Sequence, residues 1–439
     1  MTVPVRDHRA FYRKKLFWLG TIGTLLLGGG LFLVWGSWVS SSLHKDLRAR
    51  GMPTSSKQLD AWYQVADDQT NVTDRWLPVI RNMAVAEDDE RTNQLPFVGA
   101  AEAPPLPGVE WPELDVAEQF LKDRQPQLEA AWKASQISGV ARYPVDLTEG
   151  ILTDLSICQD SRLLTRLLCL DAWVASHRGD HERVVRDVHA MLALAHTFSN
   201  EPILISSLIQ FAHHSMACET LDALQQNSEW TDDQLAELQT ELARSDARRT
   251  IRQGFIGERA WGLDALRMMT LGPLRSANER EVLTCFAEAI AASESSWQEL
   301  FEVADAFNAR QLRLAGSTWQ RILHMGVLQL MPAIKQAGVI AARTEARRHS
   351  LIVILAVRRQ LLSGGRLPRS WDQIEDKFFP AGIRSRLIDP FCADTLRLLQ
   401  RDGRLIVYSI GENREDDSGA TEPGENGSRS LDVGASLSL

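Results

Sequence analysis

The stretch AIKQAGVIAARTEARRHSLIVILAVRRQLL, residues 333–362, has the strongest influence on the predicted fold. Apolar residues recur in it at helical spacing, and Gly364 and Gly365 follow its end, where glycine commonly terminates a helix. Its uncharged run, residues 351–357, is only seven residues long and lies between arginines. A run of this length is too short to span a bilayer, so the stretch predicts one long helix buried in a protein core.

The residues after this helix predict a small α+β module. A short helical segment is expected at 371–377. Two apolar runs, 395–399 and 405–410, flank Asp402-Gly403, and an aspartate-glycine pair between apolar runs is a strong β-hairpin signal. Residues 422–439 are rich in Gly, Ser and Glu, which predicts a disordered tail.

The residues before the long helix predict a helical body, residues 114–332. Apolar residues recur at helical spacing in segments 116–135, 155–176, 182–197, 202–225, 232–243, 247–269, 279–292 and 295–314. Short turns join these segments, so neighbouring helices should pack antiparallel. The pair around Gly179-Asp180 is similar to a tetratricopeptide unit, but no 34-residue period repeats. A solenoid-like, antiparallel helical bundle is therefore expected.

Residues 40–113 predict membrane-proximal helices followed by a linker. Helices are expected near 57–66 and 74–83, the first capped by Ser55 or Ser56. The stretch AEDDERTNQLPFVGAAEAPPLPGVEWPEL carries five prolines. Proline removes a backbone donor and fixes φ, so this segment predicts an extended connection.

The stretch LFWLGTIGTLLLGGGLFLVWGSWV, residues 16–39, contains 24 residues without a charge. As a helix it would be about 36 Å long, enough to cross a hydrocarbon core of about 30 Å. The alternative is a cleaved signal peptide, but the apolar run exceeds the usual length of such a core. The segment therefore predicts a transmembrane anchor.

Residues 1–15 carry more basic residues than the segment that follows the span, which predicts a cytoplasmic N-terminus and an extracytoplasmic body. In a bacterium this places the chain in the inner membrane with one span. Gly20, Thr24 and Gly28 form a row of small residues through which two such spans could associate.

Composition excludes some classes of function. The net charge of -9 and the absence of a basic stripe outside the N-terminus argue against a nucleic-acid-binding protein. The five cysteines are widely spaced, which signals neither a zinc site nor a dense disulfide framework. The spacing is compatible with one disulfide. No phosphate-binding loop or known catalytic motif is present.

A resemblance now becomes visible in the order of GGRLPRSWDQI, DPF, RDGRLIVYSIG and ENREDDSG after the long helix. This order resembles the C-terminal headpiece of type II secretion major pseudopilins. It also resembles the closing module of a group of uncharacterised membrane-anchored bacterial proteins, since LDAWYQVADDQTN, ARYPVDLTEG and EPILISSLIQFA look like recurring segments of that group. The resemblance implies a headpiece-like module over residues 333–421. It departs from pseudopilins because a helical body separates the anchor from this module.

In the pseudopilin headpiece the corresponding loop binds calcium, so the resemblance implies a calcium loop here. Its candidate ligands are the oxygen-bearing side chains of Glu412, Asn413, Glu415, Asp416 and Asp417. Calcium takes six to eight oxygen ligands, which such side chains and nearby carbonyls supply. The loop lacks the further aspartates of the pseudopilin pattern, and a solvated acidic loop is the alternative.

The sequence predicts a non-enzymatic, membrane-tethered extracytoplasmic protein that acts as an interaction or assembly scaffold, because helical stacks bind partners along extended faces. One alternative is a hydrolase that acts on envelope material, with a site assembled from Asp146, Glu149, His213 and His214. The other alternative is a structural component of a pseudopilin-like secretion assembly.

The predicted anchor leads to a direct test. After an alkaline carbonate wash of bacterial membranes, the full-length chain should stay in the membrane pellet, because a spanning helix is not released by disrupting ionic contacts. A variant without residues 1–40 should appear in the supernatant, and alkaline phosphatase fused after Leu439 should be active. Release of the full-length chain by the wash would contradict the anchor.

Overall fold

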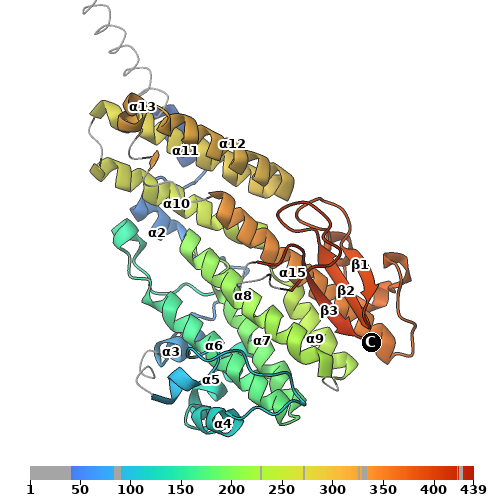
Figure 1. Cartoon of the computed structure of the whole chain (residues 1–439). Coiled ribbons are helices and arrows are strands. Elements are labelled where there is room, and N and C mark those ends of the chain that lie inside the picture. The colour runs from blue at the N-terminus through green and yellow to red at the C-terminus, as the bar shows by residue number, and fades with distance from the viewer. Residues whose placement is uncertain are drawn as a thin grey trace, which may run out of the picture.

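The computed structural model describes residues 41–83, 90–227, 230–269, 272–324, 327–328, 334–422, 424 and 429–439. Helices make up most of this part of the chain, and a three-stranded antiparallel sheet lies near the C-terminus (Figure 1). The predicted fold class, mainly helical with a small C-terminal region that contains a β-hairpin, is confirmed at this level.

The predicted membrane span, residues 16–39, lies outside the described residues, as do Gly20, Thr24 and Gly28. Among the residues that the structure does describe, no helix has both the length and the apolar character needed to cross a membrane. The anchor and the self-association through its small residues stay predictions.

The helices follow the apolar periodicity of the sequence closely. Helices α9 and α10 have the predicted bounds, and α15 ends at Leu362 as predicted. The α-helices of the described residues include α2 (Ser56–Trp62), α3 (Thr73–Arg81), α4 (Leu114–Lys122), α5 (Gln125–Ser135), α6 (Ser156–His177), α7 (His181–Thr197), α8 (Leu204–Leu224), α9 (Asp232–Ala243), α10 (Ala247–Met269), α11 (Gly272–Ser295), α12 (Trp297–Ala315), α13 (Thr318–Leu323) and α15 (Ile334–Leu362).

Side-chain caps fix where several helices begin. Thr231 and the N3 residue Gln234 form a reciprocal capping box at the start of α9. Asp180 accepts a hydrogen bond from the backbone N–H of Arg183 at the start of α7. The preceding Gly179 has φ +75°, a left-handed conformation that glycine adopts without strain, so the chain turns between α6 and α7 as the sequence predicts.

The predicted helix over residues 116–135 is wrong in one respect, since it is two helices. Helix α4 ends at Lys122 and α5 begins at Gln125, with Pro126 in its first turn. Proline has no N–H and its ring disfavours a helical residue before it. Pro126 therefore starts a new helix instead of continuing α4.

Helix α15 lies at the centre of the molecule. It packs against α8, α9, α10 and α12, and against strands β2 and β3 (Figure 1). Its apolar segment, Leu351 to Val357, is fully buried. One hydrophobic cluster includes this segment together with helices of the body and residues of the sheet. The buried segment of α15 therefore shares one core with helices of the body and with the sheet.

The sheet has the order β1 (Arg397–Arg401), β2 (Arg404–Ser409) and β3 (Val433–Ser438), with both pairs antiparallel. Asp402 and Gly403 join β1 to β2, with φ values of 51° and 71°. Positive φ at both central residues matches the two-residue turn that fits the twist of a hairpin. The predicted hairpin is confirmed.

The prediction of a disordered tail over residues 422–439 is wrong for its last part, because residues 433–438 form strand β3. Val433, Ala435 and Leu437 alternate along the strand and are buried. Their apolar character is weak in composition but has the period of two that a half-buried strand requires.

The outer edge of β3 is covered by side chains from the end of α8 and the residues after it. Asp222 accepts a hydrogen bond from the backbone N–H of Ser436 at 3.1 Å. Gln225 and Gln226 donate to the Ser436 carbonyl oxygen, and Gln226 accepts from the Ser438 N–H at 2.7 Å. These bonds satisfy backbone groups that an open sheet edge would leave for another chain.

The central position of α15 predicts a large effect of core truncation. Leu355→Ala should lower the free energy of unfolding by about 2 to 5 kcal/mol, because it removes buried methyl groups and leaves a cavity. Leu362→Ala in the same helix is the control; Leu362 is 54% exposed, so its change should stay within about 0.5 kcal/mol. Urea unfolding followed by circular dichroism measures both, and equal losses would contradict the central role of the buried segment.

Candidate functional site

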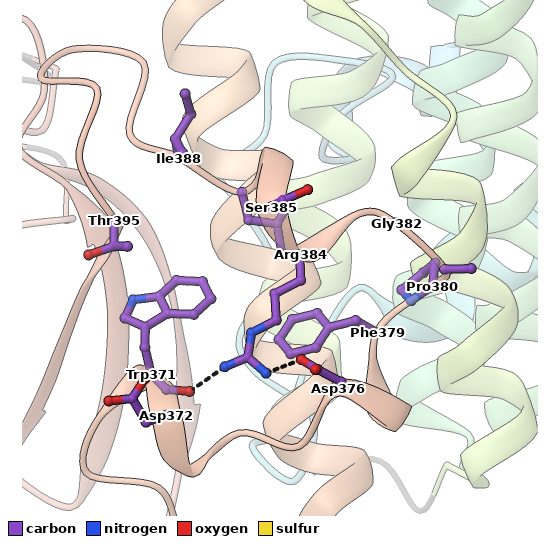
Figure 2. Close-up of a pocket in the computed structure, with 12 residues that line it drawn as sticks. Trp371, Asp372, Asp376, Phe379, Pro380, Gly382, Arg384, Ser385, Ile388 and Thr395 are labelled. Atoms are coloured by element: carbon purple, nitrogen blue, oxygen red, sulfur yellow. Dashed lines mark hydrogen bonds and ion pairs between the residues drawn. The ribbon is translucent and has the colours of Figure 1, made fainter.

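An open groove with a volume of about 890 Å³ lies on the C-terminal module. It lies between two short 3₁₀ helices, η5 (Trp371–Gln373) and η6 (Asp376–Phe378), and the loop that leads to β1 (Figure 2). The lining residues are Trp371, Asp372, Asp376, Phe379, Pro380, Ala381, Gly382, Arg384, Ser385, Leu387, Ile388 and Thr395. The sequence predicted one short helix at 371–377, which the structure replaces by η5 and η6.

Arg384 holds the floor of the groove together. Its guanidinium donates to the carbonyl oxygens of Trp371 at 2.8 Å and Ile374 at 2.7 Å. It also forms an ion pair with Asp376 and lies 5.3 Å from the centre of the Phe379 ring (Figure 2). Because these partners occupy the guanidinium on several sides, Arg384 is a structural residue of the groove.

Trp371 gives the groove an aromatic wall. The indole Nε1 donates to the Leu396 carbonyl oxygen at 2.6 Å, which ties η5 to the residue before β1. The ring is half-buried, so part of its apolar surface faces the groove (Figure 2). Tryptophan fixed in this way presents a large apolar contact area with little loss of freedom on binding.

The rim of the groove is apolar on one side and acidic on the other. Ile388 is 41% exposed, which is high for a large aliphatic side chain. Asp372 is exposed, and the side chain of Asp376 is 85% exposed even though it pairs with Arg384. Glu375, next to the groove, has a side chain that is 54% exposed and pairs with Lys377 at 2.8 Å, so among the described residues the unpaired acidic side chain of the rim is that of Asp372. The groove therefore offers apolar contact beside negative charge.

The structure places the predicted calcium ligands in one loop, where most of them already have partners. Asp416 pairs with Arg397 at 2.8 Å and accepts from the Tyr408 hydroxyl at 3.1 Å. Asn413 donates to Asp417 at 2.8 Å. Glu412 lies 3.8 Å from Arg429, and the backbone N–H of Glu415 donates to Asn413.

Arginines therefore neutralise two of the four carboxylates that the sequence assigns to calcium, Glu412 and Asp416. Within the described ranges, no group of three or more His, Cys, Asp or Glu side chains is arranged to hold a metal ion. The calcium loop stays a prediction, and any bound cation would share Asp416 with Arg397.

Two buried aspartates, Asp389 and Asp432, accept hydrogen bonds from backbone groups on either side of this loop. Asp389 accepts from the backbone N–H of Phe391 at 2.8 Å, the Ser409 hydroxyl at 2.7 Å and the Ile410 N–H at 3.0 Å. These bonds make Asp389 the cap of the turn that it opens with Pro390. Asp432 accepts from the N–H groups of Gly419 at 2.8 Å and Ala420 at 3.1 Å. The sequence missed Asp432 because its partners are far away along the chain.

The residues of the hydrolase alternative lie in different surroundings. Asp146 and Glu149 are exposed, and Asp146 accepts from the Thr148 N–H at the start of the 3₁₀ helix η3 (Leu147–Leu152). His213 and His214 are buried in α8, and burial lowers the pKa of each imidazole to about 3. His213 bonds to Ser161 and Thr165 of α6. Buried neutral imidazoles inside a helix pair are typical of a core.

The sequence did not single out the groove residues as a site. Trp371 lies in the segment GGRLPRSWDQI that carries the resemblance, but no binding role was assigned to it, and it becomes a neighbour of Arg384 only through the short turns between them. Comparison of the chain with protein-family models, with curated proteins and with solved structures finds no match.

The buried bonds of Asp389 lead to a stability prediction. In Asp389→Asn the amide nitrogen would meet the Ile410 N–H, so one donor loses its acceptor and the charge-assisted bonds weaken. The free energy of unfolding should fall by about 2 to 4 kcal/mol. Asp402→Asn in the same module is the control, since that side chain is 88% exposed. Chemical unfolding measures both, and a neutral Asp389→Asn would refute the anchoring role.

Proposed function

We propose that this protein is a membrane-tethered, extracytoplasmic interaction protein that binds a segment of a partner protein in the groove of its C-terminal module. The observation that carries the proposal is the open groove of about 890 Å³, with Trp371, Phe379 and Ile388 in its lining. The uncharged N-terminal segment supports the tether, and the helical body supports a role as a scaffold.

The chemistry of the groove favours binding over catalysis. Neither histidine nor cysteine is among the residues that line it, and its arginine is held by two carbonyl oxygens and a carboxylate. Ser385, Asp372 and Asp376 line the groove, but no hydrogen bond joins the Ser385 hydroxyl to either carboxylate in the described part of the chain, so a nucleophile paired with a base is not assembled there. The groove instead combines aromatic and aliphatic contact with a polar rim, as protein-binding sites do.

The partner segment can be described by what the groove presents. An apolar side chain would contact Trp371 and Ile388, and a neighbouring lysine or arginine would meet the exposed carboxylates of Asp372 and Asp376. Opposite charges across an interface select partners and raise association rates. The proposed ligand is thus an extended peptide in which a basic residue adjoins an aliphatic or aromatic one.

The body gives the groove a rigid support. Helices α6 and α7 pack as neighbours across the Gly179 turn, and α7 packs against α8. This arrangement supports a tetratricopeptide-like, solenoid-like description of the body. In the proposed scaffold, the body would offer further contact faces while the anchor keeps the protein at the bilayer.

The relation to pseudopilin headpieces is a second part of the proposal. The order of a long helix α15, short 3₁₀ segments, the Asp389 turn, a hairpin and an acidic loop supports it. A role as a structural component of a pseudopilin-like secretion assembly follows from that relation. The groove supports the broader role of an interaction protein over that of a filament component, because a partner can bind in the groove without assembly of a filament.

Selection of displayed random peptides on the immobilised full-length protein tests the groove. The selected peptides should share a lysine or arginine beside an apolar residue, because the rim is acidic and the wall is apolar. They should bind Asp372→Lys about tenfold more weakly, since this change reverses a charge at the rim. Ile388→Asp should weaken binding by a similar factor.

Matched variants control for general effects. Asp67→Lys changes an exposed aspartate in another part of the chain, and Leu312→Asp changes a leucine of α12 that is 75% exposed. Both should bind the selected peptides as the wild type does. Equal binding of the peptides to Ile388→Asp and to the wild type would contradict the proposed use of the groove.

A further inference from the structure

A second hollow lies where α15, α8 and the segment before β3 meet, with a volume of about 340 Å³. Three arginines line it: Arg343 and Arg347, one helical turn apart in α15, and Arg429. The hydroxyl side chains of Ser215, Thr421 and Ser430 also line it, together with one carboxylate, Glu219, which pairs with Arg347. A cavity of this size and lining is able to hold a small anionic group.

Arg343 is a partly buried cation of this helix whose guanidinium is only partly satisfied. Its Nη2 donates to the carbonyl oxygen and the hydroxyl of Ser430, at 3.1 and 3.0 Å. Its Nη1 is buried and has no hydrogen-bond partner among the described residues. No carboxylate of the described chain forms an ion pair with it. A cation that is largely removed from water usually has an anionic partner.

The two other arginines are compensated only in part. Arg347 pairs with Glu219 at 2.9 Å, and Arg429 lies 3.8 Å from Glu412. Burial lowers the pKa of the Arg343 guanidinium, and the nearby negative charge of Glu412 opposes this shift only in part. The buried Asp222 also acts on Arg347 through its charge. Among the described residues, neither Glu219 nor Glu412 forms an ion pair with Arg343, so the positive charge of Arg343 has no ion-pair partner in this part of the chain. An anion from outside the chain would balance it.

We infer that this hollow, formed by Arg343, Arg347, Arg429 and the hydroxyls beside them, binds the phosphate group of a small molecule. Guanidinium groups recognise phosphate oxygens through paired, charge-assisted hydrogen bonds. The donors come from three separate segments of the chain, which suits a tetrahedral group with oxygens in several directions. A planar carboxylate would engage one guanidinium fork and leave the others unused.

The site is separate from the peptide groove, since the two hollows have no lining residue in common. It uses the face of α15 that meets α8, whereas the groove is built from the residues after α15. Binding of phosphate and binding of peptide are therefore distinguishable by variants that affect only one of them.

Titration calorimetry with inorganic phosphate tests the inference on the full-length protein in mild detergent, at constant ionic strength maintained with sodium chloride. The wild type should bind phosphate saturably, with a Kd of about 1 mM or tighter. Arg343→Gln should weaken binding at least about tenfold, because it removes the guanidinium without a carboxylate partner. Arg429→Gln should weaken it about threefold to tenfold, and because this side chain is 58% exposed, its removal tests binding without disturbing the core.

The controls decide between specific and general effects. Arg313→Gln removes an exposed arginine of α12 and should leave the affinity unchanged. Circular dichroism checks that each variant is folded, and Asp372→Lys should bind phosphate as the wild type does. Unchanged affinity in both Arg343→Gln and Arg429→Gln would overturn the site. Acetate that binds as tightly as phosphate would overturn the assignment to phosphate.

Discussion

The structure depends on the burial of a helix that combines a fully apolar segment with charged residues. Residues Leu351 to Val357 of α15 are inaccessible to solvent, and burying each large side chain among them stabilises the fold by about 1.5 to 3 kcal/mol. A helix that is apolar around its whole circumference needs neighbours on every side. The body helices cover part of it and strands β2 and β3 cover the rest, so neither the body nor the sheet completes its core without α15.

The charged half of α15 fixes how these neighbours are placed. Although burial favours the neutral acid, Arg348 and His349 hold the pKa of Glu345 below its ordinary value. Arg348 also donates to the Leu242 carbonyl oxygen at the end of α9, and His349 bonds to the Ile388 carbonyl oxygen beside the groove. Because a buried charge must keep its partners, these bonds set the positions of α9 and of the groove loop relative to α15.

The sequence predicted those parts of the fold that local patterns determine. The bounds of α9 and α10 follow from helical periodicity, and the β1–β2 hairpin follows from Asp402-Gly403. Strand β3 was missed because its buried alternation is short and lies among residues typical of disorder. The groove and Asp432 depend on contacts between residues that are distant in the chain, which periodicity does not contain. Pro126 is itself a local signal for the break between α4 and α5. The prediction missed this break because the apolar residues on both sides of Pro126 have helical spacing.

Arginine has opposite roles in the two hollows of the molecule, and the difference lies in the number of acceptors around each guanidinium. Arg384 is surrounded by two carbonyl oxygens and a carboxylate, so its charge and donors are used within the fold. Arg343 has only the carbonyl and hydroxyl of Ser430 within the described chain, and one of its nitrogens is buried without an acceptor. A guanidinium of the first kind stabilises a surface that other groups use for binding. A guanidinium of the second kind carries a cost in the unliganded protein, and an anion that completes its hydrogen bonds would remove that cost.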